Sequence, residues 1–395
     1  HGLGGLERSV FDLARHLVRE GVRVTLITRP ATQPGEVHPE VSTHFVPYRT
    51  FPLAGRKGTT VIDRSTAYPR FGVRAGEAAA ALVRRGEIDI VHGFGASVLG
   101  YARQRAEHTA PLVLNPQGME EFGATDPSHA RLKRIAYLPL RRAVRECAAA
   151  ADAVLATDRS LVPAVRHHLG VPDERIATIP NALDLDALDA LATPEDGVRM
   201  RARFGCQDDV VLLSVGRLEE NKGFHLLAQA LAALREHSGR IARGGWRWVL
   251  VGDGPFRGRL ESLVGSLGIT PNVLFAGKLP DPDLHAWYEA ADLFVHPTLY
   301  EGSSLVTLEA MAHRRACVVT DAGGLPDKVR TGVNGWVVPA GDASALAAAI
   351  SGALEIPARL QEMGMAGRRI VDEEFSWRAT IKQTLALYDR LLRRP

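Results

Sequence analysis

The sequence predicts an α/β protein with two domains. At 395 residues the chain is too long for one ordinary hydrophobic core. Runs with helical and strand-like periodicity alternate along both halves, which is typical of parallel sheets covered by helices. A hydrophobic content of 46% and a charged content of 24% describe an ordinary soluble globular protein. No apolar stretch approaches the roughly 20 residues that a membrane-spanning helix needs.

The first half alternates from its beginning. An amphipathic helix is expected over residues 6–21 and another over residues 76–86. Short apolar runs bounded by turn residues predict the strands of this half. These strands are residues 22–30, 88–94, 111–118, 151–158 and 174–181.

The second half repeats the alternation more clearly, after a crossover at residues 179–188. Asp342 is expected to cap the helix that follows it. The expected strands are 209–218, 246–252, 272–277, 292–297, 316–321 and 335–340. The expected helices are 224–237, 256–268, 284–292, 305–314, 344–354 and 376–394.

The cysteines indicate a reducing compartment. Cys147, Cys206 and Cys317 are scattered singly, and no spacing between them resembles a zinc or redox motif. A cytoplasmic location is the simplest expectation. The chain begins at His1 without an initiator Met, which leaves room for a missing N-terminal piece.

Glu301 and Glu309 are the most informative pair of residues. An apolar run typical of a buried strand precedes them, and an amphipathic run typical of a helix follows Gly302. The start of a helix offers free backbone N–H groups and a positive dipole end, which suit a phosphate. Two acceptor carboxylates beside a phosphate site suggest a ligand with a phosphate and several hydroxyls, such as a nucleotide sugar.

Arg217 and Lys222 lie in the loop after a strand that we expect to be central. Two cations at the carboxyl end of a parallel strand suit a diphosphate. A solvated loop with ordinary surface charge is the competing interpretation, and the two glutamates downstream favour the functional one.

Two glycine-rich turns precede expected helices. Gly2, Gly4 and Gly5 would let a ligand approach the backbone, although a tight turn explains them equally well. Gly252-Asp253-Gly254 loosely resembles a dinucleotide fingerprint, but the spacing is wrong and no acidic residue stands at the expected distance. A turn lining a nucleotide site is favoured over a nicotinamide pocket.

Two D-x-D pairs have the form of a metal site. Asp281 and Asp283 precede a helix, so capping explains them, and Asp184 and Asp186 lie in the crossover. Neither pair shows the mixed ligand set of a dedicated metal centre, so no metal is expected.

The first half offers two weaker features. His92 ends a strand and is a candidate for catalysis, although a lone histidine there is as often structural. Residues 131–145 carry six basic residues and no acidic one, interleaved with apolar side chains. This segment could lie on an anionic membrane, whereas a solvated basic helix is the commoner explanation.

With these motifs in order, nearly the whole chain resembles retaining glycosyltransferases of family 4, which have the GT-B fold. The segments that carry the resemblance are GGLER, DIVHGFG, IPNALDLDAL, SVGRLEENKGF, VLVGDGP, the E-x7-E run and GGLPDKVRTGVNGWVVP. The resemblance implies two Rossmann-like domains with parallel sheets facing across a cleft. Residues 1–182 would bind the acceptor, residues 183–376 would bind the nucleotide sugar, and residues 377–395 would pack back on the first domain.

The resemblance also implies roles for individual residues. Arg217 and Lys222 clamp the donor diphosphate, Glu309 takes the ribose hydroxyls, and Glu301 contacts the transferred sugar. The other donor-side positions are Gly4 and Gly5 facing the phosphate, Gly254 in a turn at the nucleotide, Gly302, Ser303, Ser304 and Leu305 around the phosphate or sugar, and the backbone of Lys278 and Leu279 beside the base.

Two departures from the family pattern stand out. Family members usually carry a strand of about ten residues before the Gly-Gly loop, whereas only three residues precede Gly4 here. The first sheet is therefore expected to lack that strand and to expose unpaired edges. Many members also have a histidine where this chain has Gln117, which cannot act as a general base near neutral pH. That shifts some weight to His92.

The expected activity is metal-independent, retaining transfer from a nucleotide sugar, with UDP favoured and GDP as the second choice. The acceptor is an envelope glycan, a lipid-linked intermediate or a small molecule; no nucleic acid is expected. A degenerate homologue that binds the donor without transfer is the main alternative. A glycoside hydrolase also uses two carboxylates but fits the Arg217 and Lys222 pair less well. The oligomeric state is left open.

Overall fold

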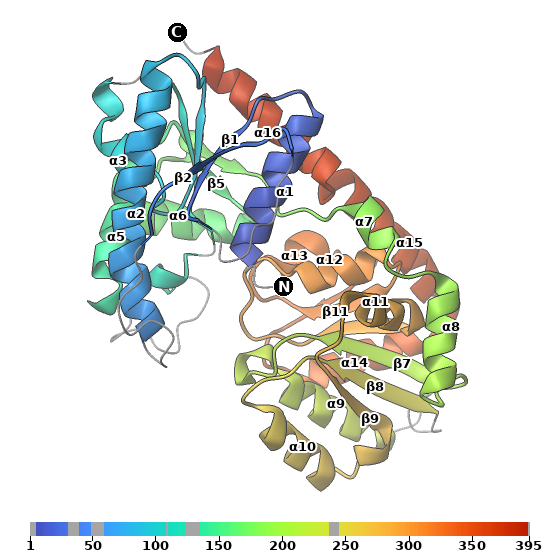
Figure 1. Cartoon of the computed structure of the whole chain (residues 1–395). Coiled ribbons are helices and arrows are strands. Elements are labelled where there is room, and N and C mark those ends of the chain that lie inside the picture. The colour runs from blue at the N-terminus through green and yellow to red at the C-terminus, as the bar shows by residue number, and fades with distance from the viewer. Residues whose placement is uncertain are drawn as a thin grey trace. The chain divides into compact units, whose positions relative to one another are not determined.

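The computed structural model describes residues 5–30, 39–48, 59–107, 110–117, 119–123, 135–236 and 245–393. The chain divides into two compact units. The first comprises His1–Asn181 and Trp377–Pro395, and the second comprises Ala182–Ser376 (Figure 1). Every strand pair in the named sheets is parallel, which confirms the α/β class with two parallel-sheet units.

The described residues of the first unit form two sheets. Four strands lie in the order β3 (Val91–Phe94), β4 (Leu112–Asn115), β5 (Ala153–Ala156) and β6 (Ile176–Thr178). A separate pair consists of β1 (Thr25–Thr28) and β2 (Ser42–Phe45). The helices are α1 (Gly5–Arg19), α2 (Thr59–Arg84), α3 (Leu99–Arg103), α5 (Leu138–Ala150), α6 (Val162–Leu169) and α16 (Trp377–Leu392).

The last helix, α16, belongs to this first unit although it comes from the end of the chain. The Trp377 ring stacks on His16 of α1 with ring centroids 5.2 Å apart. The Tyr388 hydroxyl lies 2.6 Å from Nδ1 of His92 on β3. Both contacts join α16 to elements near the start of the sequence.

Among the described residues, β1 pairs only with β2, and β3 pairs only with β4. A cavity of about 200 Å³ lies beside β1 and β3, and apolar side chains of these strands and of α1 and α2 line it. Unpaired edges were expected in this part of the first sheet. The residues before Gly5 lie outside the described part of the chain.

In its described residues, the second unit is built on a six-stranded sheet. Its order is β12 (Gly335–Val338), β11 (Ala316–Thr320), β10 (Leu293–His296), β7 (Val210–Val215), β8 (Trp246–Val251) and β9 (Val273–Gly277). Helices and strands of this unit can be followed in Figure 1. The helices are α7 (Leu185–Asp189), α8 (Pro194–Arg203), α9 (Phe224–Glu236), α10 (Arg257–Ser266), α11 (Asp281–Ala290), α12 (Leu305–Ala312), α13 (Leu325–Lys328), α14 (Ala343–Glu355) and α15 (Pro357–Glu374).

Alternate residues of the central strands feed two separate cores. Val211 and Leu213 of β7 belong to one apolar cluster, whereas Val210 and Leu212 belong to another. Because successive side chains of a strand point to opposite faces, the sheet is buried on both sides. This explains why its strands appear in the sequence as continuous apolar runs.

The strand order reverses direction between β7 and β10. From β7 the chain proceeds to β8 and β9 on one side, and then returns to β10 on the other side. In open parallel sheets, ligands bind beyond the carboxyl ends of the strands at such a switch point. The loops after β7 and β10 are the ones that carry Lys222 and Glu301.

The D-x-D pairs are resolved as helix starts. Asp184 is the N-cap of α7 and accepts from the Ala187 amide, 3.2 Å away. The expectation that the pair Asp281 and Asp283 caps its helix is wrong, because Pro280 holds the N-cap position of α11 and both aspartates lie in the first turn. Acidic side chains in the first turn interact favourably with the positive end of the helix dipole. No helix in the described ranges is both long and apolar enough to cross a bilayer.

Candidate functional site

Glu301 lies in the loop between β10 and α12, and two basic side chains converge on one of its oxygens. Nζ of Lys222 lies 2.8 Å from Oε2, and Nε2 of His296 lies 2.8 Å from the same oxygen. Burial alone would raise the pKa of the Glu301 carboxyl, but His296 and then Lys222 outweigh it and lower the pKa to about 2. Glu301 is therefore an ionised acceptor at neutral pH.

His296 was not singled out from the sequence. It is the last residue of β10 and is almost completely buried. Its position at the carboxyl end of a strand, five residues before Glu301, is the signal that sequence reasoning could have used. The strand fixes the backbone of His296, so the ring sets where the Glu301 carboxylate lies.

Helix α12 begins at Leu305, shortly after Glu301. Ser304 is the N-cap, and its hydroxyl accepts from the Thr307 amide, 3.4 Å away, and lies 2.9 Å from the Thr307 hydroxyl. The first backbone N–H groups after the cap, from Leu305 onward, have no partner inside the helix. Within the described chain, the buried hydroxyl of Ser303 has no hydrogen-bond partner. The helix start thus offers donors suited to an anion.

Glu309 lies one turn further into α12 and is half-buried. The hydroxyl of Tyr288, from α11, donates to Oε2 of Glu309 over 2.9 Å. Glu301 therefore stands in the loop before α12 and Glu309 within α12, and the two carboxylates are held by different side chains. This separation agrees with different tasks for the two carboxylates.

Arg217 and Lys222 are found in separate ion pairs. Arg217 is largely exposed and pairs with Glu219 at 2.9 Å, whereas Lys222 is mostly buried against Glu301. Both lie in the loop after β7, as the sequence predicts. The expectation that both meet a diphosphate stays a prediction, because each cation is paired with a carboxylate here.

Two glycines let the loops around Glu301 pack against each other. Gly223 has φ +68°, and a Cβ there would lie 1.9 Å from the carbonyl oxygen of Pro297 in the loop after β10. Gly323 has φ +54°, and its Cβ would lie 1.8 Å from the carbonyl oxygen of Glu301. No other residue fits at such distances, so the loops after β7, β10 and β11 form one packed group.

The other predicted donor-side positions of the second unit lie in the loops after β8 and β9. The Gly254 amide donates to Oδ1 of Asp253 over 2.8 Å in the loop after β8. Lys278 is exposed and Leu279 is half-buried, directly after the edge strand β9. Gly5 is the first residue of α1, and Gly4 lies outside the described residues.

His92 and Gln117 line one small cavity of about 40 Å³ in the first unit. Nδ1 of His92 meets the Tyr388 hydroxyl, its ring stacks on Phe94 at 5.1 Å, and burial lowers its pKa to about 4. Gln117 has φ +61°, and its backbone N–H donates to Oδ1 of Asn115 over 3.0 Å. Within the described residues, its buried side-chain nitrogen Nε2 has no hydrogen-bond partner. Their catalytic roles remain predictions, and the low pKa makes His92 a weak base.

Known proteins share both the sequence pattern and the fold. Residues 3–187 match the protein family described as Glycosyltransferase Family 4, and residues 209–355 match the family described as Glycosyl transferases group 1. D-inositol 3-phosphate glycosyltransferase 1 of Catenulispora acidiphila is 30% identical over 404 residues, which span 98% of this chain and 90% of that protein.

Two solved structures extend the likeness to the fold. Sucrose-phosphate synthase from Thermosynechococcus elongatus has a TM-score of 0.75 and 25% identity, covering 98% of this chain and 94% of its own. Anabaena HepE in complex with UDP has a TM-score of 0.71 and 21% identity, covering 98% and 96%.

The fold and the similarity to known proteins define a GT-B glycosyltransferase that acts on nucleotide-sugar donors. The chain belongs to glycosyltransferase family 4.

Proposed function

We propose that this protein is a retaining, metal-independent glycosyltransferase that moves a sugar from UDP, with GDP as the second choice, to an envelope glycan, a lipid-linked intermediate or a small molecule. The observation that carries the proposal is the Lys222–Glu301 ion pair at the switch point of the sheet, beside the start of α12. UDP is favoured because HepE, a protein of similar fold, is solved in complex with UDP.

In the proposed reaction, the acceptor hydroxyl attacks the anomeric carbon from the face that the diphosphate leaves. The new glycosidic bond forms while the bond between the anomeric carbon and the phosphate oxygen breaks. The departing diphosphate takes the acceptor's proton, so the protein need supply no nucleophile. Its contribution is positioning and stabilisation of the charge that develops on the leaving group.

Each donor-side residue has a role in this scheme. Lys222 and Arg217 stabilise the diphosphate, which makes a metal ion unnecessary. Ionised Glu301 accepts from the sugar hydroxyls, and Glu309 accepts from the ribose hydroxyls. Gly302, Ser303, Ser304 and Leu305 present the backbone and hydroxyl donors at the start of α12 to the phosphate or the sugar.

A thermal-shift series with UDP-, GDP- and ADP-sugars tests the donor and the clamp together. The preferred nucleotide should raise the melting temperature of the wild type, because a ligand that binds only the folded state stabilises it. Arg217→Ala and Lys222→Ala should reduce that rise, whereas Arg369→Ala, at an exposed position on α15, should not. A full ligand-induced rise in both clamp variants would refute the assignment.

The same preparations separate the alternatives. A glycoside hydrolase should not respond to UDP or GDP. A degenerate homologue should bind the nucleotide but should neither transfer nor hydrolyse the donor sugar. The reason to consider a degenerate homologue is Gln117, which stands where many family members have a histidine. Transfer to an added acceptor supports the enzyme.

We also propose that the cytoplasmic protein contacts the inner face of the membrane through residues 131–145. In the described part of this segment, Ile135 and Leu138 are more than half exposed, and the Arg142 side chain is 86% exposed. Arg141 and Arg145 instead lie over the Phe122 ring, at 5.1 and 5.3 Å. Apolar side chains beside exposed cations suit an anionic bilayer surface.

Vesicle sedimentation tests this contact. Binding to vesicles with anionic lipid should weaken as salt rises, because the attraction is screened. Ile135→Ser should weaken it further, and Ile356→Ser, at an exposed position of the second unit, should not. Binding that ignores both salt and lipid charge would rule the contact out.

A further inference from the structure

Tyr288 contacts the Glu309 carboxylate from a fully buried position. It lies in α11, and none of its surface is exposed. Its hydroxyl is 2.9 Å from Oε2 of Glu309 and 3.2 Å from the carbonyl oxygen of Val306. Both neighbours can only accept, so the hydroxyl must be the donor, and the charged carboxylate is the stronger acceptor. Burial, and then the charge of Glu309, raise the pKa of Tyr288, which keeps the hydroxyl protonated.

The ring of Tyr288 is held in place by its neighbours. It stacks on the His313 ring with centroids 5.5 Å apart and an angle of 5° between the planes. The rings of His285 and Phe294 lie 5.7 and 5.9 Å away at tilted angles. Close packing of this kind restricts the ring and keeps its hydroxyl directed at Glu309.

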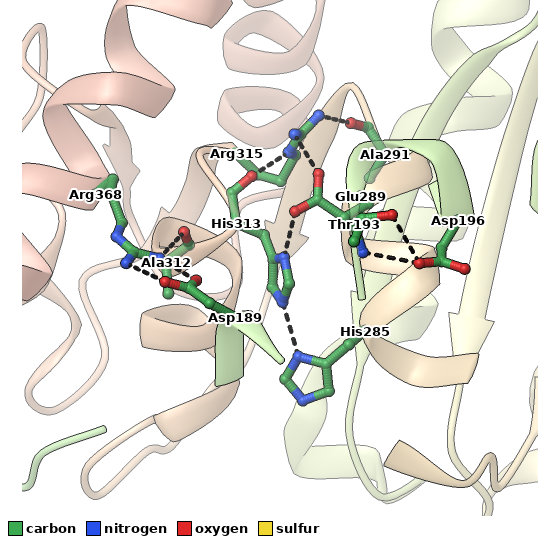
Figure 2. Close-up of polar contacts among 10 residues, drawn as sticks. All are labelled: Asp189, Thr193, Asp196, His285, Glu289, Ala291, Ala312, His313, Arg315 and Arg368. Carbon is green, nitrogen blue, oxygen red and sulfur yellow. Dashed lines mark hydrogen bonds and ion pairs between the residues drawn. The ribbon is translucent and has the colours of Figure 1, made fainter. Parts of the chain in front are cut away.

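His313 is itself fixed by a hydrogen-bonded series, which Figure 2 shows. Its Nε2 lies 2.7 Å from Nδ1 of His285, and its Nδ1 lies 2.6 Å from Oε1 of Glu289. Arg315 donates to Oε2 of Glu289 over 3.2 Å and to the carbonyl oxygen of Ala291 over 2.8 Å. The support behind Tyr288 therefore reaches from α11 to the residues after α12.

A glutamate near the start of a helix otherwise samples several rotamers, and ordering it on binding costs free energy. A carboxylate that must accept from the two hydroxyls of a ribose gains affinity when it is already oriented. The Tyr288 hydroxyl donates to Oε2 of Glu309 from the buried side of α12. We propose that Tyr288 is a positioning residue that holds Glu309 for the ribose diol and thereby sets the preference for ribonucleotides over deoxyribonucleotides.

This inference rests on the proposed role of Glu309 as the ribose acceptor. Its test compares two ligands in the same protein preparation: UDP and 2′,3′-dideoxy-UDP, or the GDP pair if GDP is the nucleotide that binds. Affinities are measured by calorimetry on the full chain. The ratio of the two affinities does not depend on the fraction of protein that is folded, so a loss of stability cannot imitate the effect.

Tyr288→Phe keeps the ring and removes the donor. We expect it to weaken UDP binding roughly 5- to 20-fold, which corresponds to one hydrogen bond to a charged group acting indirectly. Binding of the dideoxy nucleotide should stay unchanged. Tyr101→Phe is the matched control, because Tyr101 is also fully buried and donates to a carbonyl oxygen, that of Ala110, over 2.7 Å. It should leave the ratio at the wild-type value.

The outcomes distinguish the inference from the proposed function. If the wild type binds both nucleotides equally, or Glu309→Gln keeps the preference for UDP, the role of Glu309 fails and the inference falls with it. If Glu309→Gln abolishes the preference but Tyr288→Phe retains it, only the inference is wrong. Should Tyr288→Phe not fold, Tyr288→Met fills the space without a hydroxyl and must lower the same ratio.

Discussion

Glu301 depends on two partners that come from different parts of the chain. His296 stands five residues before it, and Lys222 stands 79 residues before it in sequence. The partners lie together because β7 and β10 are neighbours in the sheet. Nζ of Lys222 and Nε2 of His296 both lie within hydrogen-bond distance of Oε2, and together they hold the carboxylate in its charged form.

The acidity of Glu301 gives a prediction for stability. Its pKa of about 2 in the folded protein lies below the ordinary 4.5, so the unfolded chain binds a proton there more readily. The stability contribution is therefore present above pH 4.5 and is lost as the pH falls toward 2. Glu301→Gln should cost on the order of 2–3 kcal/mol at pH 7 and progressively less below pH 4.5.

Urea unfolding between pH 2.5 and 7 measures this difference. Glu362→Gln, at an exposed position on α15, serves as the control and should follow the wild type throughout. A penalty for Glu301→Gln that stays constant across the whole pH range would contradict the assignment of the charge.

At the residue scale, the sequence predicted positions but not partners. Lys222, Glu301 and Glu309 stand in local motifs, so a strand, a turn and a helix start were enough to single them out. Their contacts with His296 and Tyr288 depend on which strands and helices become neighbours. That information is spread over the whole second unit, and no local pattern of residues contains it.

At the scale of elements, the capped start of α12 is expected to contribute both to stability and to binding. Ser304→Ala removes the cap and should cost about 1 kcal/mol of unfolding free energy. Asp342→Ala should cost a similar amount, because Asp342 caps α14 through a 2.9 Å bond from the Ala345 amide. Only Ser304→Ala should also weaken nucleotide binding, as titration calorimetry would show. Equal effects of both variants on nucleotide affinity would contradict a phosphate site at α12.

The packed loops give a second prediction at this scale. Gly323→Ala should destabilise the protein through two effects, the positive φ and the clash with the carbonyl oxygen of Glu301. Gly332→Ala isolates the first effect, because Gly332 has φ +84° and no atom within 4 Å of the added Cβ. Gly323→Ala should cost at least about 1–2 kcal/mol more in thermal unfolding. The same cost for both variants would mean that the loop yields freely.

Elements with clear periodicity were predicted well, and the exceptions have physical reasons. The helix expected over 76–86 is the end of α2, which begins at Thr59 and contains Pro69. A proline normally argues against a helix interior, so the earlier turns were not predicted. The helix α15 was not predicted at all. In the structure, its buried residues Met363 and Ile370 pack into the two different apolar clusters of the second unit. Burial in the folded protein, rather than local propensity, stabilises such segments.

At the scale of the whole molecule, each unit has its own core and a histidine whose pKa is lowered by burial. Burial lowers the pKa of His92 in the first unit to about 4. In the second unit, burial and the nearby His313 lower the pKa of His285 to about 4. The fold class and the two units followed from chain length and alternation, whereas these histidines did not, because each meets a partner that is distant in sequence, Tyr388 of α16 for His92 and His313 for His285.

The two histidines predict how acid acts on each unit. Between pH 6.5 and about 4, the unfolded chain binds a proton at His285 that the folded chain does not, so stability falls as the pH falls. His285→Asn removes this group and should flatten the decline of the second unit across that range. Four of the five tryptophans, Trp246, Trp248, Trp287 and Trp336, belong to the second unit, so tryptophan fluorescence reports mainly on its unfolding.

His92→Asn is the matched control, since it removes a histidine with a similarly lowered pKa from the other unit. It should leave the fluorescence-detected slope at its wild-type value, while His285→Asn reduces it. If His285→Asn keeps the wild-type slope, or if both variants flatten it equally, the acid response does not arise from His285, whose pKa is lowered by burial and then by its contact with His313. Because that contact also supports the ring of Tyr288, loss of stability and loss of ribonucleotide preference should begin in the same pH range.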